Sequence, residues 1–228
     1  IRDRSYRGLG MTMKIALMNE WSQAPKNEII YRKLRAVADK YGHSVYNVGM
    51  VKEDDMPHLT YIHLGLMAAV LLNSGAVDFV VTGCGTGEGA MISLNNYPGV
   101  MCGLISEPVD GYLFCQINNG NAISLPYAKG FGWGAELNLQ YIFEHILSCE
   151  RGNGYPPDKK EVQNQNAAIL NRVKSIVNRD IMTILNTMDR DILLTSCSGK
   201  AFRKCLFENS QITEIADYIR KIKVPAKV

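Results

Sequence analysis

Apolar and β-branched runs alternate with helical periodicity from Met13 to about Leu147. Short apolar runs predict five strands, at 14–18, 44–48, 77–82, 100–105 and 121–125. Between the first two strands, apolar residues at positions 30, 34, 37, 38 and 41 recur at the spacing of one helix face. Further helices are predicted at 58–75, closed by Gly75, and around 139–147. Because strands alternate with helices, we expect βαβ units and a parallel sheet covered on both faces.

The pattern changes after the Gly/Pro-rich stretch CERGNGYPPDKK, where only helical stripes follow, at 169–177, 181–188 and 212–219. We therefore predict an α/β fold, with a Rossmann-like parallel five-stranded sheet flanked by helices at 13–150 and an all-helical C-terminal extension at 151–228. A tail of this length cannot form a large hydrophobic core by itself. We therefore expect it to pack on the sheet domain or on a neighbouring subunit. The opening IRDRSYRGLGMT has no periodicity, and residues 1–12 are interpreted as a vector-derived remnant or a loose extension.

Composition and charge exclude several classes of protein. The net charge of +3 is small, and no block of basic residues is interleaved with aromatics, so we expect no nucleic-acid partner. The apolar stretch around Leu66 to Leu72 is well short of the roughly 20 residues that span a bilayer, so we expect no membrane association. The six cysteines have neither disulfide-framework nor metal-ligand spacing, which predicts no metal site and a reducing, cytoplasmic location.

The stretch VVTGCGTGEGA, at 80–90, follows the third predicted strand and permits three interpretations. As a dinucleotide-binding loop, Gly85, Gly87 and Ala90 supply the glycine spacing and Glu107 the later acid, although this fingerprint usually follows the first strand. As a purely structural turn, the glycines allow close packing and Cys84 is a small core residue.

The third interpretation gives the thiol of Cys84 a chemical role. Cys84 lies where a strand ends and a helix begins, so unpaired backbone N–H groups gather near it. Glycines at 85, 87 and 89 let that backbone approach a ligand closely. The positive potential at a helix start favours a thiolate and stabilises an oxyanion. One loop would then supply both a base and an anion hole.

Three stretches carry a family resemblance: DFVVTGCGTGEGAMISLNNYPGV, ISEP and QINNGNAISL. They resemble the type B ribose-5-phosphate isomerases and galactose-6-phosphate isomerases, without a gap from Tyr61 to Asn121 and more loosely from Met13 to about Leu147. The segment AKGFGWGAELNL and the helical extension resemble a subgroup partly linked to the isomerisation of unsaturated uronates. The resemblance implies an aldose–ketose isomerase that needs no cofactor. It also implies a homodimer or homotetramer in which the active site lies between subunits.

The resemblance also implies residue roles. Cys84 would be the base that moves a proton between C1 and C2 of an open-chain sugar. The anion hole for the enediolate would comprise the backbone of Gly85, Gly87 and Gly89 with the hydroxyl of Thr86. The side chains that match sugar-contacting positions of the family are Tyr61, Asn118 and Asn121.

The sequence also departs from the family. Glu20-Trp21 stands where an Asp-His pair is usual, Ile117 replaces the ring-opening histidine, and no arginine occurs between Arg35 and Arg151 to grip a phosphate. We therefore expect either a substrate that needs no ring opening or another residue for that step, with its anionic end held by lysines, backbone amides, or an arginine of the tail or a partner subunit. The candidates for these tasks are Glu20 and His63 for ring opening, and Ser22, Lys26 and Lys129 for substrate binding.

The leading hypothesis is an intramolecular oxidoreductase, an aldose–ketose isomerase of an anionic sugar such as ribose 5-phosphate, another pentose or hexose phosphate, or a hexuronate. A narrower alternative is a ketol-isomerase of unsaturated-uronate breakdown products. Two others are an NAD(P)-binding oxidoreductase that uses the same glycine loop, and a non-catalytic sugar-binding relative.

Overall fold

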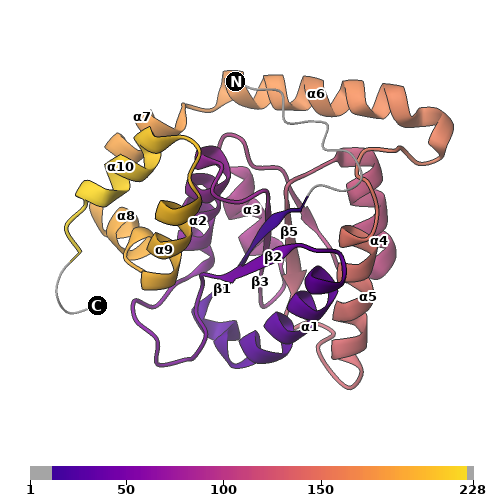
Figure 1. Ribbon diagram of the computed structural model, residues 1–228, viewed down its shortest axis with the longest axis horizontal. Coiled ribbons are helices and arrows are strands. Elements are labelled where there is room, and N and C mark those ends of the chain that lie inside the picture. The colour runs from indigo at the N-terminus through magenta and orange to yellow at the C-terminus, as the bar shows by residue number, and fades with distance from the viewer. Residues whose placement is uncertain (1–11, 225–228) are drawn as a thin grey trace.

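The protein is represented by a computed structural model that describes residues 12–224, so the predicted extension at 1–12 lies outside it except for Thr12. Five strands form one parallel sheet in the order β2-β1-β3-β5-β4 (Figure 1). Their bounds are β1 Lys14–Asn19, β2 Ser44–Asn47, β3 Phe79–Cys84, β4 Cys102–Leu104 and β5 Ala122–Pro126. The predicted fold class, a Rossmann-like parallel sheet with helices, is confirmed.

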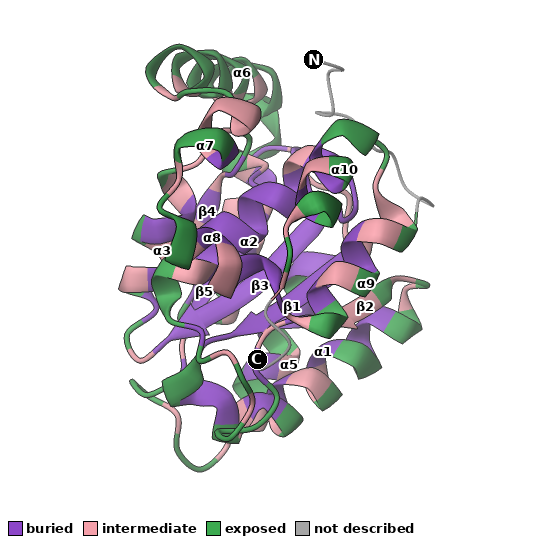
Figure 2. Ribbon diagram, turned by 90° about the vertical axis from the view of Figure 1, so that its left-hand side faces the viewer, coloured by how far each residue is buried: buried purple, intermediate pink, exposed green. Residues whose placement is uncertain are grey.

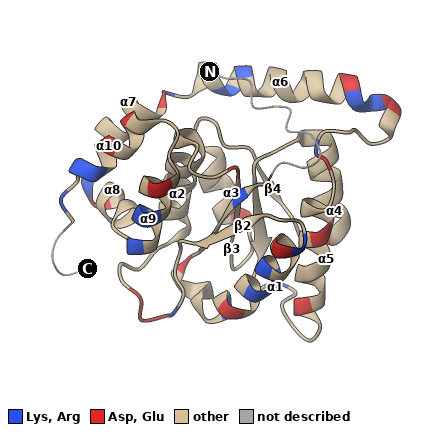
Figure 3. Cartoon of the chain, viewed as in Figure 1, with Lys and Arg blue, Asp and Glu red and all other residues tan. Residues whose placement is uncertain are grey.

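Alternate residues of each central strand enter two separate cores. On β1, Ile15 and Leu17 join the core beneath one sheet face, whereas Ala16 and Met18 join the core on the other. Both faces are therefore apolar, as expected when helices cover a parallel sheet on both sides. Lys14 is the one charged residue within the described strands, and most charged side chains lie on the outer helices (Figure 3).

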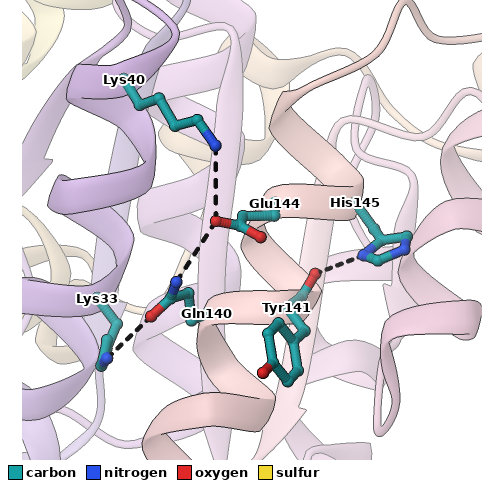
Figure 4. Close-up of polar contacts among 6 residues, drawn as sticks. All are labelled: Lys33, Lys40, Gln140, Tyr141, Glu144 and His145. Carbon is teal, nitrogen blue, oxygen red and sulfur yellow. Dashed lines mark hydrogen bonds and ion pairs between the residues drawn. The ribbon is translucent and has the colours of Figure 1, made fainter.

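Helices α1 (Asn27–Lys40) and α5 (Ala135–Leu147) cover one face of the sheet, and α2 (Tyr61–Ser74) and α3 (Glu88–Asn95) the other. The outer seam between α1 and α5 is polar (Figure 4). There, Lys33 Nζ donates to Gln140 Oε1 at 3.0 Å, and Lys40 Nζ lies 3.8 Å from Glu144 Oε1. Exposed pairs of this kind stabilise little, so the apolar inner face holds the two helices to the sheet.

Besides two tail helices that lie outside the predicted stripes, at 190–197 and 200–209, three short elements of the sheet domain were not anticipated from the sequence. They are a 3₁₀ helix η1 (Trp21–Lys26), an α-helix α4 (Pro108–Leu113) and a single π-helical turn η2 (Phe114–Asn118). A local signal for α4 was present, because Glu107 and Asp110 form a reciprocal capping box and Pro108 occupies the first helical position. The elements are too short for apolar periodicity to reveal them.

The tail comprises η3 (Pro157–Lys159), α6 (Lys160–Val177), α7 (Ile181–Thr187), α8 (Arg190–Cys197), α9 (Lys200–Asn209) and α10 (Thr213–Lys221). Helices α7–α10 pack beside α2, and residues such as Leu193, Phe202 and Ile219 share one apolar core with it. None of the 18 described residues of α6 is buried (Figure 2). No helix within residues 12–224 is long and apolar enough to cross a membrane.

Candidate active site

Cys84 ends β3 at the carboxyl edge of the sheet, where the order of the strands reverses. The chain passes from β1 to β2 on one side and then returns to β3 on the other side of β1. In open parallel sheets, ligands bind in the crevice beyond the carboxyl ends of the strands at such a switch point. Cys84 is 7% exposed, so its side chain is largely buried at this edge.

The glycine loop Gly85–Gly87 joins β3 to α3 in three residues. Within residues 12–224, no hydrogen-bond acceptor is found for the backbone N–H groups of Gly85, Thr86 and Gly87. Gly87 is the N-cap of α3, so the first-turn N–H groups of that helix follow directly. Unpaired N–H groups and a helix start together favour an anion at this loop.

Gly87 is required by its backbone conformation and by its surroundings. Its φ of 79° lies in the left-handed region, and an added Cβ would come within 2.6 Å of Leu104 Cδ1. Its carbonyl oxygen accepts a 2.6 Å hydrogen bond from the Ser124 hydroxyl on β5. The neighbouring strand therefore fixes the orientation of this peptide.

Two side chains predicted to contact substrate lie at the glycine loop: Thr86, which is part of the loop, and Tyr61 of α2. Thr86 is exposed, and its Oγ1 accepts from the Glu88 N–H at 3.3 Å, which leaves the hydroxyl proton available to a ligand. Tyr61, the first residue of α2, lies with its ring 3.5 Å from the position a Cβ would take on Gly89. Glu88 is exposed at the start of α3, where a negative charge is favourable.

Glu20 and Ser22 lie on the neighbouring strand end. Asn19 of β1 is the register partner of Gly83 on β3, so Glu20 leaves the sheet beside Cys84. The Glu20 carboxylate is the N-cap of η1, accepting from the Ser22 N–H at 2.9 Å and from the Ser22 hydroxyl. Glu20 and Cys84 are both largely buried, so a carboxylate and a thiol share one edge of the sheet.

Lys26 ends η1 and turns toward the segment after β5. Its Nζ donates to Gln23 Oε1 at 2.8 Å and to the Tyr127 carbonyl, and it lies 4.9 Å from the Phe131 ring centroid. Partial burial lowers the pKa of Lys26. Lys129 is exposed in the same segment, and its backbone N–H donates to the Gly85 carbonyl at 3.2 Å. Both predicted lysines therefore lie at the Cys84 edge.

His63 belongs to the entry of α2. Its Nδ1 accepts from the Thr60 N–H at 2.9 Å, an arrangement in which His63 takes the place usually held by Glu or Gln in a capping box. Half-burial of the ring lowers its pKa. The ring therefore has a local structural task, and its Nε2 is the nitrogen left for chemistry.

Asn118 and Asn121 lie at the opposite edge of the sheet from Cys84. Asn121 precedes β5, whose far end, Pro126, is the register partner of Cys84. Its side chain donates to the Gly99 carbonyl at 2.7 Å and accepts from the Met101 N–H at 2.8 Å. A single chain thus does not bring the two asparagines to Cys84, because one full strand length separates the two edges.

The structure places two further polar residues at the Cys84 edge that the sequence analysis did not single out. The Asn19 side chain donates to Asn27 Oδ1 at 2.8 Å, and its own Oδ1 is buried without a partner in the described residues. The hydroxyl of the fully buried Tyr127 is likewise unpartnered there, and burial raises its pKa. No sequence pattern marks these residues, because their burial depends on η1 and on the segment after β5.

The dinucleotide interpretation fails on strand order. It needs the acid Glu107 on a strand adjacent to the one that carries the glycine loop. Glu107 follows β4, and β5 lies between β4 and β3. The Glu107 carboxylate instead takes part in the cap of α4.

The other buried cysteines are unsuited to act as bases. Burial raises the pKa of Cys115 to about 11 and of Cys197 and Cys205 to about 12, and it also raises that of Cys102. These four side chains therefore stay protonated at neutral pH. Among residues 12–224, no group of three or more His, Cys, Asp or Glu side chains is placed to hold a metal ion.

Two family models match the sequence. A model described as Ribose/Galactose Isomerase matches residues 15–143, and one described as Ribose-5-phosphate isomerase matches residues 176–222. No curated protein is a significant match. The first match covers the sheet domain with the Cys84 loop, so the chain belongs to the ribose/galactose isomerase family. It is a sugar isomerase of the aldose–ketose type.

Solved structures agree with this assignment. The ribose-5-phosphate isomerase of Vibrio parahaemolyticus is 54% identical, with a TM-score of 0.90 over 92% of this chain and 99% of that chain. A 4-deoxy-L-threo-5-hexosulose-uronate ketol-isomerase complexed with a tartrate is 52% identical, with a TM-score of 0.89 over 91% and 98%. The type B ribose 5-phosphate isomerase of Trypanosoma brucei shares the fold at 20% identity, with a TM-score of 0.58 over 72% and 99%.

Proposed function

We propose that this chain interconverts the aldose and ketose forms of an open-chain anionic sugar, with Cys84 as the base. The Cys84 thiolate takes the proton from the carbon beside the carbonyl, and the electron pair of that C–H bond forms the enediolate. The thiol then returns the proton to the neighbouring carbon. No external oxidant or reductant is needed, because one carbon is oxidised as its neighbour is reduced.

The observation that carries this proposal is the set of unpaired N–H groups directly after the thiol. Negative charge that develops on the carbonyl oxygen is accepted by the backbone of Gly85, Gly87 and Gly89 and by the Thr86 hydroxyl. Removing one donor of this kind typically costs ~3–4 kcal/mol of transition-state stabilisation. The Glu20 carboxylate, beside Cys84, is suited to move the proton between the two substrate oxygens.

For the substrate, we favour a linear or readily opened hexuronate over a pentose phosphate. Ile117 stands where the family resemblance places a ring-opening histidine. The Cys84 edge offers the lysines Lys26 and Lys129, and no arginine occurs between Arg35 and Arg151 to form a fork. A carboxylate carries one negative charge and needs less positive charge from the protein than a phosphate dianion does. The 52%-identical ketol-isomerase, complexed with a tartrate, supports this choice, and the Vibrio parahaemolyticus isomerase supports ribose 5-phosphate as the second candidate.

A substrate panel tests this choice. Wild-type protein is assayed with ribose 5-phosphate, galactose 6-phosphate, galacturonate, glucuronate and the linear product of unsaturated-uronate breakdown, and the Cys84→Ala variant is the blank in each assay. We expect the highest kcat/KM for the linear uronate product. Turnover of ribose 5-phosphate with a higher kcat/KM would overturn the substrate assignment and leave Cys84 as the base, whereas full activity in the variant would overturn the mechanism.

The opposite placement of Asn118 and Cys84 supports a homodimer, or a homotetramer built from such dimers, with active sites between subunits. A two-fold axis brings one edge of a subunit against the other edge of its partner, so each site would combine Cys84 of one chain with the asparagines of the other. Helix α6 adds an exposed apolar stripe that includes Ile169, Val173 and Ile176. We propose that this stripe is covered in the assembly.

We propose that residues 13–150 form the catalytic domain and that residues 151–228 form its helical extension. The shared core of α2 with α7–α10 supports an extension that stabilises the sheet domain. The six cysteines are all free, which supports a reducing compartment such as the cytoplasm.

A further inference from the structure

The segment after β5 is tied directly to the glycine loop. The Tyr127 N–H donates to the Cys84 carbonyl at 2.9 Å, and the Ala128 and Lys129 N–H groups donate to the Gly85 carbonyl at 2.9 and 3.2 Å. The chain then leaves this anchor as the stretch KGFGWG, from Lys129 to Gly134, before α5 begins. This stretch, which we call the aromatic loop, therefore starts at the edge that carries the thiol.

The two aromatic residues of the aromatic loop behave differently. Phe131 packs edge-on against Tyr127, with ring centroids 6.4 Å apart, and Lys26 Nζ lies over its ring. Trp133 is wholly exposed to solvent. A tryptophan is a large apolar side chain that normally buries most of its surface. An isolated indole beside a substrate site therefore indicates a partner that arrives from outside the subunit.

Glycines flank each aromatic residue of the loop. Gly130 and Gly134 have φ angles of 73° and 84°, in the left-handed region. Within residues 12–224, a Cβ on Gly130, Gly132 or Gly134 would meet no other atom within 4 Å, so packing there does not require glycine at these positions. Glycine backbones interconvert freely between positive and negative φ, and open space surrounds them here. The loop has both the freedom and the room to change conformation about these residues.

The geometry also limits how far the indole can move. Trp133 is four residues beyond Lys129, whose N–H is bound to the Gly85 carbonyl. Four extended residues span at most about 14 Å. Trp133 therefore remains within reach of the glycine loop in every conformation that keeps this anchor.

We propose that Trp133 is a substrate-contacting residue: when substrate binds, the aromatic loop folds over Cys84 and the indole stacks on the C–H face of the sugar chain. The inference rests on the proposed function and extends it to specificity. The closed loop excludes water from the enediolate, which strengthens the hydrogen bonds of the anion hole.

Fluorescence tests this contact, because the sequence has two tryptophans, Trp21 and Trp133. Trp21 Nε1 donates to the Glu53 carbonyl, and its ring stacks on His58. In a Trp21→Phe variant, Trp133 is the single indole. We expect tartrate, and separately the preferred sugar acid, to shift its emission to shorter wavelength with a saturable response. A Trp133→Phe variant should show no such shift. Unchanged Trp133 emission at ligand concentrations that calorimetry shows to be saturating would overturn the proposal.

Kinetics provide the second arm. Trp133→Ala should lower kcat/KM by about tenfold, mainly by raising KM. The kcat/KM of Trp133→Phe should lie between those of the wild type and Trp133→Ala. The unfolding midpoint should not change, because the Trp133 side chain is wholly exposed to solvent. The matched control is Leu137→Ala, since Leu137 is a half-exposed apolar residue in the first turn of α5. We expect this control variant to have unchanged kinetics.

The outcomes separate this inference from the proposed function. Wild-type kinetics in Trp133→Ala, with Cys84→Ala inactive, would overturn the role of Trp133 and leave the isomerase mechanism standing. Loss of the dimer in Trp133→Ala, by light scattering, would also overturn it, since the indole would then serve the partner subunit. A saturable emission change without turnover of any sugar would overturn the proposed function and support the contact.

Discussion

Glu20 and Cys84 leave the sheet side by side, because Asn19 and Gly83 are register partners on the adjacent parallel strands β1 and β3. Their backbones are separated by about one strand spacing, ~4.8 Å. Both side chains are nearly buried, and the glycine loop with its unpaired N–H groups follows the thiol. A carboxylate and a thiol thus lie next to unpaired backbone N–H groups at the switch point of the sheet.

Replacing Cys84 by serine should abolish isomerisation while keeping the fold. The hydroxyl is far less acidic than a thiol and nearly isosteric with it, so we expect kcat to fall by about 10²–10⁴-fold. Cys149→Ser is the matched control, since Cys149 lies beyond α5 and contacts Gln116. Steady-state kinetics and circular dichroism of both variants check the prediction. Equal losses in the two variants would contradict a catalytic thiol.

Gly87→Ala should destabilise the protein and disrupt the anion hole. The left-handed φ and the clash with Leu104 together should lower the free energy of unfolding by about 2–4 kcal/mol. Gly132→Ala, with no φ constraint and open space around the Cβ, should leave the free energy of unfolding unchanged. Urea unfolding measures both. Similar stability of the two variants would show that the loop adopts another conformation in solution.

Subunit complementation tests the shared site. Homodimers of Cys84→Ala, and separately of Asn118→Ala, should be inactive or nearly so. When the two variants are unfolded together and refolded, half the dimers should be mixed and each should hold one intact site, which restores about a quarter of wild-type activity. Asn118 suits this test because it is exposed, whereas Asn121 holds the backbone at Gly99 and Met101. If the mixture stays inactive, each site is built within one chain.

The cap of α2 should be sensitive to acid. His63 Nδ1 accepts from the Thr60 N–H as the neutral ring, and burial lowers the pKa of His63 below its value of about 6.5 in the unfolded chain. The stability it contributes is therefore fully present above about pH 6.5 and is lost as the pH falls from there through the lowered pKa.

The His63 side chain is partly exposed to solvent, so the loss of unfolding free energy should be modest, about 0.5–1 kcal/mol between pH 8 and pH 5. His63→Gln keeps an acceptor at this position and does not titrate. The difference in unfolding free energy between wild type and this variant should change across that pH range and stay constant above it. A constant difference at all pH values would show that His63 does not cap the helix.

Local patterns in the sequence were sufficient to predict the sheet and the main helices. The alternation of Ile15 and Leu17 with Ala16 and Met18 specifies two buried faces, and the apolar stripe of α1 specifies its inner side. Strand ends moved by up to two residues, because hydrogen bonding to neighbouring strands sets them. The glycine spacing after Cys84 left three interpretations of the loop open, and the anion-binding loop was one of them.

Only the tertiary structure decided which residues meet. Sequence separation places Asn121 closer to Cys84 than Glu20 is, yet Glu20 lies beside the thiol and Asn121 lies a strand length away. The physical reason is that periodicity records which face of an element is buried, whereas strand order follows from pairing and packing between distant segments. The exposure of Trp133 is likewise a property of the assembled surface, since nothing in KGFGWG distinguishes it from the packed Phe131.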